Sequence, residues 1–114
     1  MEKVALYRSI AKLIIAALGQ KKGVSKHKIR YQTIFDEQNG NYILLRNGWK
    51  GSIRFYNIIV HIEVDENGLV WLHQDNTDLI IADLLMEKGI PRDHIVLAFH
   101  PPIARPDTTF ATGG

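Results

Sequence analysis

The sequence predicts an α+β fold with an N-terminal helix, an antiparallel β-meander of about four strands, a second helix, a short final strand and an extended tail. Apolar residues recur at helical spacing over residues 2–18, and the period changes to two over residues 28–74. Glycine-containing turn signals divide that middle segment at hairpin intervals. With 114 residues, 46% of them apolar and 23% charged, we expect one domain over residues 1–114.

The first helix is predicted over residues 2–18, with Gly19 as its stop. Its core-facing stripe has spacings of three and four: Leu6, Ile10, Leu13, Ile14 and Ala17. Further apolar residues widen the stripe, which favours cover by a sheet and by a second chain, so we expect a homo-oligomer.

Four strands are predicted near residues 28–37, 41–47, 52–64 and 69–74. The turns between them are predicted at Gln38-Asn39-Gly40, at Asn47-Gly48 with Gly51, and at Glu66-Asn67-Gly68. Short connections of this kind impose antiparallel neighbours.

The pairing of the third hairpin follows from its turn. If Gly68 adopts the left-handed conformation in a three-residue loop, Ile62 pairs with Leu72 and one face of the hairpin becomes wholly apolar. The opposite face then carries His61 across from His73 and Glu63 across from Trp71.

The C-terminal third begins with a second helix. Asp75-Asn76-Thr77 supplies its N-cap, and its core-facing stripe is Leu79, Ile80, Leu84 and Leu85. Lys88-Gly89-Ile90-Pro91 ends the helix, and residues 93–99 are predicted to form a last short strand or extended segment that stops at His100-Pro101-Pro102. Residues 103–114 are predicted to be an extended tail.

Composition and motifs exclude several functions. The chain has no cysteine, which excludes disulfides, cysteine-ligated metal centres and thiol catalysis. It lacks phosphate-binding loop, zinc-protease, serine-hydrolase and calcium-loop motifs, so no enzyme class and no cofactor is indicated. The apolar run at residues 13–18 is far shorter than the roughly 18 residues of a membrane span, so we expect a cytoplasmic protein.

Charge is strongly asymmetric along the chain. Residues 1–54 hold eleven Lys or Arg against three acids, a net charge of +8, whereas residues 55–114 hold three against nine, a net charge of −6. The asymmetry is compatible with a basic face for an acidic partner or nucleic acid, with self-association of opposite faces, and with a solvated surface on which the two halves interleave.

The candidate phosphate contacts cluster before the first strand: Lys21, Lys22, Lys26, Lys28 and Arg30, with Arg46, Lys50 and Arg54 on later strands. No helix-turn-helix or zinc-finger pattern accompanies them, so sequence-specific reading of bases is not indicated.

Two groups of polar residues form a candidate functional face: His61, Glu63, Trp71 and His73, and separately His100 with Arg105. The first group, with Asp75 nearby, has the residue types of a transition-metal or acid–base site, and the same residues also suit a solvated sheet face. We favour the solvated face for the first group. For His100 we favour a hydrogen-bonded anchor of the tail over a catalytic role.

Several motifs in order resemble one known family. They are Asn47-Gly48-Trp49-Lys50-Gly51, Val60-His61-Ile62, Gly68-Leu69-Val70-Trp71-Leu72, Asn76-Thr77-Asp78, and the run from Lys88 to Phe99-His100-Pro101-Pro102 with Arg105-Pro106. Together they cover nearly the whole chain and resemble the XisI family, the fdxN element excision controlling factors of cyanobacteria.

The resemblance implies a small α+β, non-enzymatic accessory or regulatory factor. Its family is linked to site-specific DNA rearrangement in heterocyst differentiation and acts with an XisH-like protein, while a separate recombinase, XisF, performs the chemistry. No catalytic, metal or cofactor-binding residues are implied. The alternatives are a DNA-binding accessory factor that uses the basic N-terminal half and a metal-dependent or hydrolytic enzyme built on the histidine cluster. Because relatives often occur in many copies per genome, an alternative is that this chain functions in a different two-protein system, unrelated to excision.

Overall fold

A long helix, a five-stranded sheet and a short second helix follow one another along the chain. The computed structural model describes residues 2–22 and 28–113. Its elements are α1 (Glu2–Lys22), β1 (Arg30–Asp36), β2 (Asn41–Lys50), β3 (Ile53–Val64), β4 (Val70–Asp75), α2 (Ile81–Glu87), η1 (Arg92–His94), β5 (Ile95–Leu97) and η2 (Pro102–Asp107). This order confirms the predicted α+β fold.

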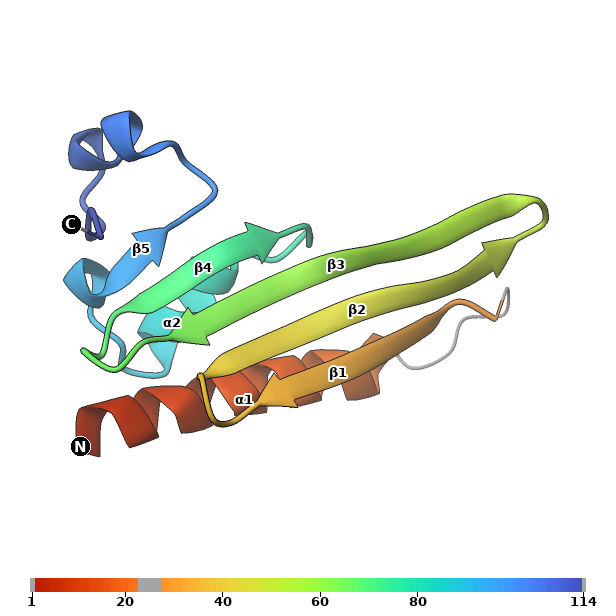
Figure 1. Ribbon diagram of the computed structural model, residues 1–114, viewed down its shortest axis with the longest axis horizontal. Helices are drawn as coiled ribbons and strands as arrows, with labels where there is room; N and C mark the ends of the chain where they lie inside the picture. Colours follow the sequence, from red (N-terminus) through yellow and green to blue (C-terminus); the bar gives the residue numbers. More distant parts are fainter. Residues whose placement is uncertain (1, 23–27, 114) are drawn as a thin grey trace.

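The strands lie in the order β1-β2-β3-β4-β5 in one sheet. The first four are antiparallel neighbours, as predicted, and β5 adds to β4 in parallel. A parallel neighbour needs a crossover connection, which here contains α2. Figure 1 shows the long β2–β3 hairpin projecting past the C-terminal end of α1. We call this projecting part, residues 46–57, the hairpin arm.

The turn predicted at Asn47-Gly48 with Gly51 is partly wrong, because Asn47 and Gly48 lie inside β2, whereas Gly51 does lie in the turn that follows Lys50. A Cβ atom on Gly48 would lie 2.7 Å from the Cα atom of Ile29. This glycine therefore permits a close approach between two backbone segments, which is the other common reason for glycine within a strand.

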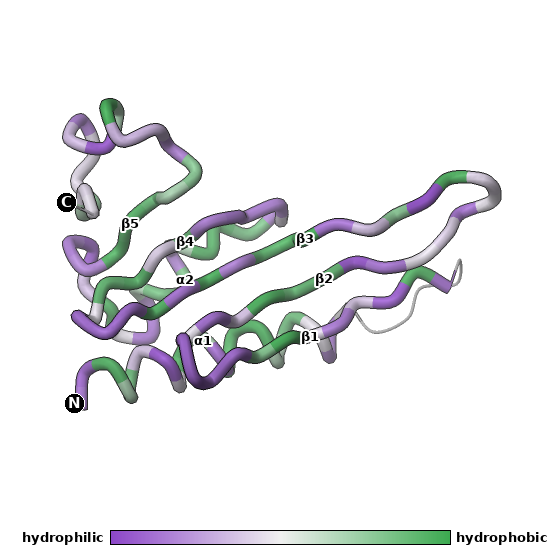
Figure 2. The backbone as a smooth tube through the Cα atoms, viewed as in Figure 1, coloured by the Kyte–Doolittle hydropathy of each residue, from purple (hydrophilic) through white to green (hydrophobic). Residues whose placement is uncertain are grey.

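The core lies between α1, α2 and one face of the sheet. Figure 2 shows hydrophobic residues along α1 and in the middle of β2 and β3. The residues of α1 buried in it are Tyr7, Ile10, Ala11, Ile14, Ile15 and Leu18. Their strand partners include Tyr42, Leu44, Val60, Ile62, Val64, Val70 and Leu72. The predicted stripe was partly wrong, because Leu6, Leu13 and Ala17 are exposed and the buried stripe is centred on neighbouring positions.

The predicted helix stop at Gly19 is also wrong, since α1 continues to Lys22. A Cβ atom on Gly19 would lie 2.7 Å from Cγ2 of Thr33 in β1. Because glycine has no side chain, α1 and β1 can approach each other closely at this position. The packing gained by this approach outweighs the low helix propensity of glycine.

The pairing of the β3–β4 hairpin agrees with the prediction. Gly68 has a φ of +85°. Ile62 pairs with Leu72 and Glu63 with Trp71. One difference is a β-bulge between His61 and Ile62, which makes Gln74 the Cα partner of His61 and leaves His73 as the extra residue.

The entry of α2 corrects the prediction. The helix begins at Ile81, and Leu79 and Ile80 are exposed rather than core-facing. Asp75 still acts on the helix start, because its carboxylate accepts hydrogen bonds from the backbone N–H of Ile81 at 2.9 Å and of Thr77 at 3.2 Å. The cap is therefore supplied by a residue six positions upstream.

The tail corrects a second prediction, since the described part of the predicted extended tail, residues 103–113, is not simply extended. Pro102–Asp107 forms the 3-10 helix η2, and Ala111 then forms a parallel bridge with Val96 of β5. A Cβ atom on Gly113 would lie 2.5 Å from the Trp71 ring. The tail thus covers the β4–β5 part of the sheet face opposite α1.

We predict that Leu44→Ala, at the centre of the core, lowers the free energy of unfolding by about 2–5 kcal/mol, because the fully buried side chain leaves a cavity. Urea denaturation followed by circular dichroism measures this. The matched control is Leu6→Ala on the exposed side of α1, for which a change within about 0.5 kcal/mol is expected. Equal losses in both variants would contradict the assigned orientation of α1.

Candidate functional site

The face of the sheet opposite α1 carries the predicted histidine cluster. Nε2 of His73 lies 2.7 Å from Oε1 of Glu63, and the rings of His61 and His73 lie 4.7 Å apart. The Trp71 ring is nearly parallel to the His73 ring, at 6.1 Å and 9°. The structure therefore brings these four predicted residues together, although the β-bulge pairs His61 with Gln74 rather than with His73.

Protein groups already engage one nitrogen atom of each histidine. His61 Nε2 lies 2.9 Å from Asn41 Oδ1, and Asn41 Nδ2 donates to Asp36 at 3.1 Å. Burial, and secondly the charge of His73, lower the pKa of His61, while Glu63 opposes them. The neutral form of His61 is therefore the favoured one at neutral pH.

Asp75 does not join this cluster, which corrects the expectation that it lies nearby as a metal ligand or acid. Its carboxylate is directed to the start of α2, where Thr77 and Ile81 bond to it. Within residues 2–22 and 28–113, no group of three or more histidine, aspartate or glutamate side chains is placed to hold a metal ion.

Arg105 is the anchor of the tail. Its guanidinium donates to the carbonyl oxygens of His100 at 3.1 Å, Ala98 at 3.3 Å and Thr112 at 3.3 Å, and it lies over the Trp71 ring at 5.8 Å. His100, which was predicted to anchor the tail through its side chain, takes part through its backbone carbonyl. The five donors of an arginine explain why it bonds three carbonyls at once.

Those of the predicted basic residues that the structure describes lie around one end of the molecule. Lys21 lies in the last turn of α1, Lys28 precedes β1, and Arg30 is the first residue of β1. Lys26 and the side chain of Lys22 lie outside the described residues. Lys28 and Arg30 line a shallow hollow of about 480 Å³ together with Arg54, whose guanidinium lies 5.4 Å from the Trp49 ring.

A groove between α1 and α2 was not predicted. Its volume is about 360 Å³, and it is lined by Leu13, Ile14, Ala17, Leu18 and Leu84, with Lys21 and Lys88 as its two charged residues. We call it the helix groove. The unusually wide apolar stripe of α1 was the sequence signal for it, because part of that stripe is left uncovered by the sheet.

A second apolar surface lies over β1, β2 and β3 on the side opposite α1. Strand pairing places Ile34 beside Ile43, and Leu45 beside Ile58, all on this side. We call it the open face. Sequence reasoning missed it because the sheet pairing of β1 was needed to see that these residues meet.

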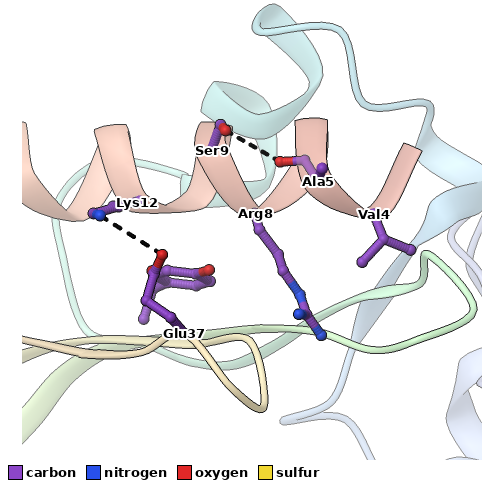
Figure 3. Close-up of a pocket in the computed structure, with 7 residues that line it drawn as sticks. Val4, Ala5, Arg8, Ser9, Lys12 and Glu37 are labelled. Carbon is purple, nitrogen blue, oxygen red and sulfur yellow. Dashed lines mark hydrogen bonds and ion pairs between the residues drawn. The ribbon is translucent and has the colours of Figure 1, made fainter. Parts of the chain in front are cut away.

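A third hollow, of about 420 Å³, lies beside the N-terminal half of α1, and Figure 3 shows Arg8 reaching from α1 toward the sheet. Arg8 donates to the carbonyl of Val64 at 3.1 and 3.3 Å, and Lys12 lies 3.7 Å from Glu37. Burial, and secondly Glu37, raise the pKa of Tyr42 to about 12. These cations are engaged by the protein itself, so they fasten the strand ends to α1.

The fold and these surfaces define a small α+β protein in which one long helix covers one face of a β-meander and the C-terminal tail folds over the other. Two solved structures share this arrangement, both from Anabaena variabilis. A XisI-like protein is 30% identical, with a TM-score of 0.86 over 95% of this chain and 97% of that one. The fdxN element excision controlling factor XisI is 33% identical, with a TM-score of 0.83 over 97% and 99%.

The family model described as "XisI protein" matches residues 1–112. The chain therefore belongs to the XisI family, and the resemblance found in its sequence is confirmed. No curated protein matches the chain. Among the described residues, no helix is both long and apolar enough to cross a membrane.

We predict that His61 makes stability depend on pH. Its pKa is lowered in the folded protein from 6.5, so the unfolded chain binds the proton more readily and the free energy of unfolding falls as pH drops below that value. Urea denaturation at about pH 7.5 and pH 5 should show a smaller decrease for His61→Gln than for the natural chain. Superimposable pH profiles would contradict a destabilised charged form of His61.

Proposed function

We propose that this protein is a non-enzymatic accessory or regulatory factor that acts by binding a protein partner, such as an XisH-like protein, in the excision of a DNA element. Family membership supports the controlling role, since one solved relative is named as an fdxN element excision controlling factor. The observation that carries the binding role is the helix groove, an apolar hollow in which Leu13 and Ala17 of α1 are exposed.

The chemistry of the helix groove indicates the kind of segment that it would hold. Leu13 is contributed by α1 and Leu84 by α2, and the lining on α1 extends from Leu13 to Lys21 in the C-terminal half of the helix. Lys21 and Lys88 are its charged residues. An amphipathic helix fits such a groove with its apolar side, and acidic residues at its edge would face the two lysines.

Co-purification of this chain with the product of its genomic neighbour, sized by light scattering, tests the proposal. We expect a complex that persists at high salt, because apolar burial is not screened by ions. Leu13→Asp should abolish it, since a charge would be buried against the partner's apolar side chains. The control is Ile103→Asp, an equally drastic change at an exposed residue of η2.

Absence of a complex with the natural chain would overturn the partner role. A complex that tolerates Leu13→Asp would place the partner elsewhere on the molecule.

A second candidate function is DNA binding through the basic end. The observation in its favour is a segregation of charge: residues 38–62 contain Arg46, Lys50 and Arg54 and no acid, and Lys28 and Arg30 lie beside the hairpin arm. Arg54 lies over the Trp49 and Tyr56 rings, so cationic and aromatic groups that suit phosphates and bases occur together.

For this candidate we predict that raising the salt concentration from about 50 to about 200 mM lowers the affinity for a labelled DNA duplex roughly a hundredfold, which is the decrease expected for about four phosphate contacts. Fluorescence anisotropy measures it. The triple variant Lys21→Glu, Lys22→Glu, Lys26→Glu should abolish binding, whereas sequence changes in the duplex should have little effect. Unaltered binding by the triple variant would remove this part of the surface from consideration.

A further inference from the structure

The centre of the open face consists of apolar side chains, whose exposure to water is unfavourable. Ile34 is 45% exposed and Ile58 is 38% exposed, and both lie next to further aliphatic side chains, Ile43 and Leu45. A sheet covered on one side by helices normally alternates apolar residues toward the core with polar residues toward water. A cluster of aliphatic residues on the second side therefore indicates an interaction surface.

Charges of opposite sign lie at the two ends of the open face. At the end near the β1–β2 and β3–β4 turns, strand pairing aligns Asp36, Asn41 and Glu63 on this side. At the other end it carries Arg30 beside Asn47 and Arg54 beside Trp49. The face is thus acidic at one end, apolar in the middle and basic at the other.

We propose that the open face binds the open face of a second copy of this chain, with a two-fold axis that runs across the strands near Leu45 and Ile58. A two-fold interface places the same patch of both copies in contact, so the patch must complement itself. Leu45 pairs with Ile58, and Ile58 lies about midway between Arg54 and Glu63 along β3.

Rotation about that axis reverses the strand direction. It places Arg54 of one copy over Glu63 of the other and leaves the aliphatic residues against each other. An axis along the strands would instead place arginine on arginine, which like-charge repulsion disfavours. The two faces would pack as aligned sheets.

The dimensions suit a dimer. Three strands about 4.8 Å apart and ten residues long at about 3.4 Å per residue give a footprint of roughly 500 Å² on each copy. Two copies then bury about 1,000 Å² in total, which is about the lower limit of the area buried in specific protein–protein interfaces. The tail covers Val96 and contacts Trp71, so it confines the interface to β1, β2 and β3.

Cysteine cross-linking tests which surface pairs. The chain has no cysteine of its own, so Ile58→Cys introduces one thiol close to the proposed axis, on the same side of the axis region as its counterpart in the second copy. A bismaleimide with a spacer of roughly 10 Å should yield a covalent dimer, since facing sheets lie about 10 Å apart, and light scattering of the natural chain should give twice the 13.0 kDa mass. Ile103→Cys, in η2, is the control and should remain largely monomeric on denaturing gels after the same cross-linking treatment.

A charge exchange tests the orientation. Arg54→Glu should weaken the dimer at least about tenfold, and adding Glu63→Arg should restore it, because the pair is re-formed with its signs reversed. Circular dichroism of each variant verifies that it is folded.

A natural chain that stays monomeric at all concentrations would overturn the proposal. Equal cross-linking through residues 58 and 103 would overturn the assignment to the open face. Failure of the double variant to recover would overturn the antiparallel orientation. None of these outcomes depends on the partner protein or on DNA.

Discussion

The apolar contact between α1 and one face of the sheet is the interaction on which the rest of the structure depends. Ala11 and Ile15 of α1 are fully buried against that face. A helix of 21 residues spans about 32 Å, so α1 can follow the strands for most of their length. Because α2 joins the same core, both helices lie on one side. The other side of the sheet is left to the tail and to whatever the protein binds.

The polar residues on that other side form a connected row across the strands. Arg105 lies over Trp71, whose ring stacks near His73. His73 contacts Glu63 and approaches His61, from which hydrogen bonds continue through β2 to β1. The hydrogen bond from Asn41, the largest cause, lowers the pKa of Asp36 at the far end of the row. The cluster that looked like a metal site therefore ties the tail and four strands together, and it borders the apolar part of the open face.

The sequence allowed the β3–β4 hairpin to be predicted almost residue by residue, because alternation has a period of two and a shift by one residue would have mixed its faces. It did not allow Gly19 and Gly48 to be interpreted correctly. Both glycines have the local appearance of breakers, yet each is required by a neighbour that is distant in sequence, Thr33 or Ile29. The parallel pairing of β5 with β4 was not predicted for the same reason, since the path of a crossover connection is set by tertiary packing.

The surfaces themselves were harder to predict than the elements. A wide apolar stripe on α1 indicated that something covers the helix, but only the position of α2 shows that Leu13 and Leu84 line a groove. Ile34 and Ile58 are separated by 24 positions and share a patch only through β2, which lies between their strands. Linear charge asymmetry did survive folding in one respect, since the hairpin arm and the residues leading into β1 gather their cations at one end.

The sheet separates the two apolar surfaces, and this separation has a consequence for assembly. A dimer formed through the open face would carry its two helix groove surfaces on its outer sides, because α1 and α2 lie on the opposite side of each sheet. Lys21 lines the helix groove, so it would remain accessible in such a dimer, whereas Arg54 would be engaged. Self-association and partner binding are therefore compatible, and only a nucleic acid that required Arg54 would compete with the second copy.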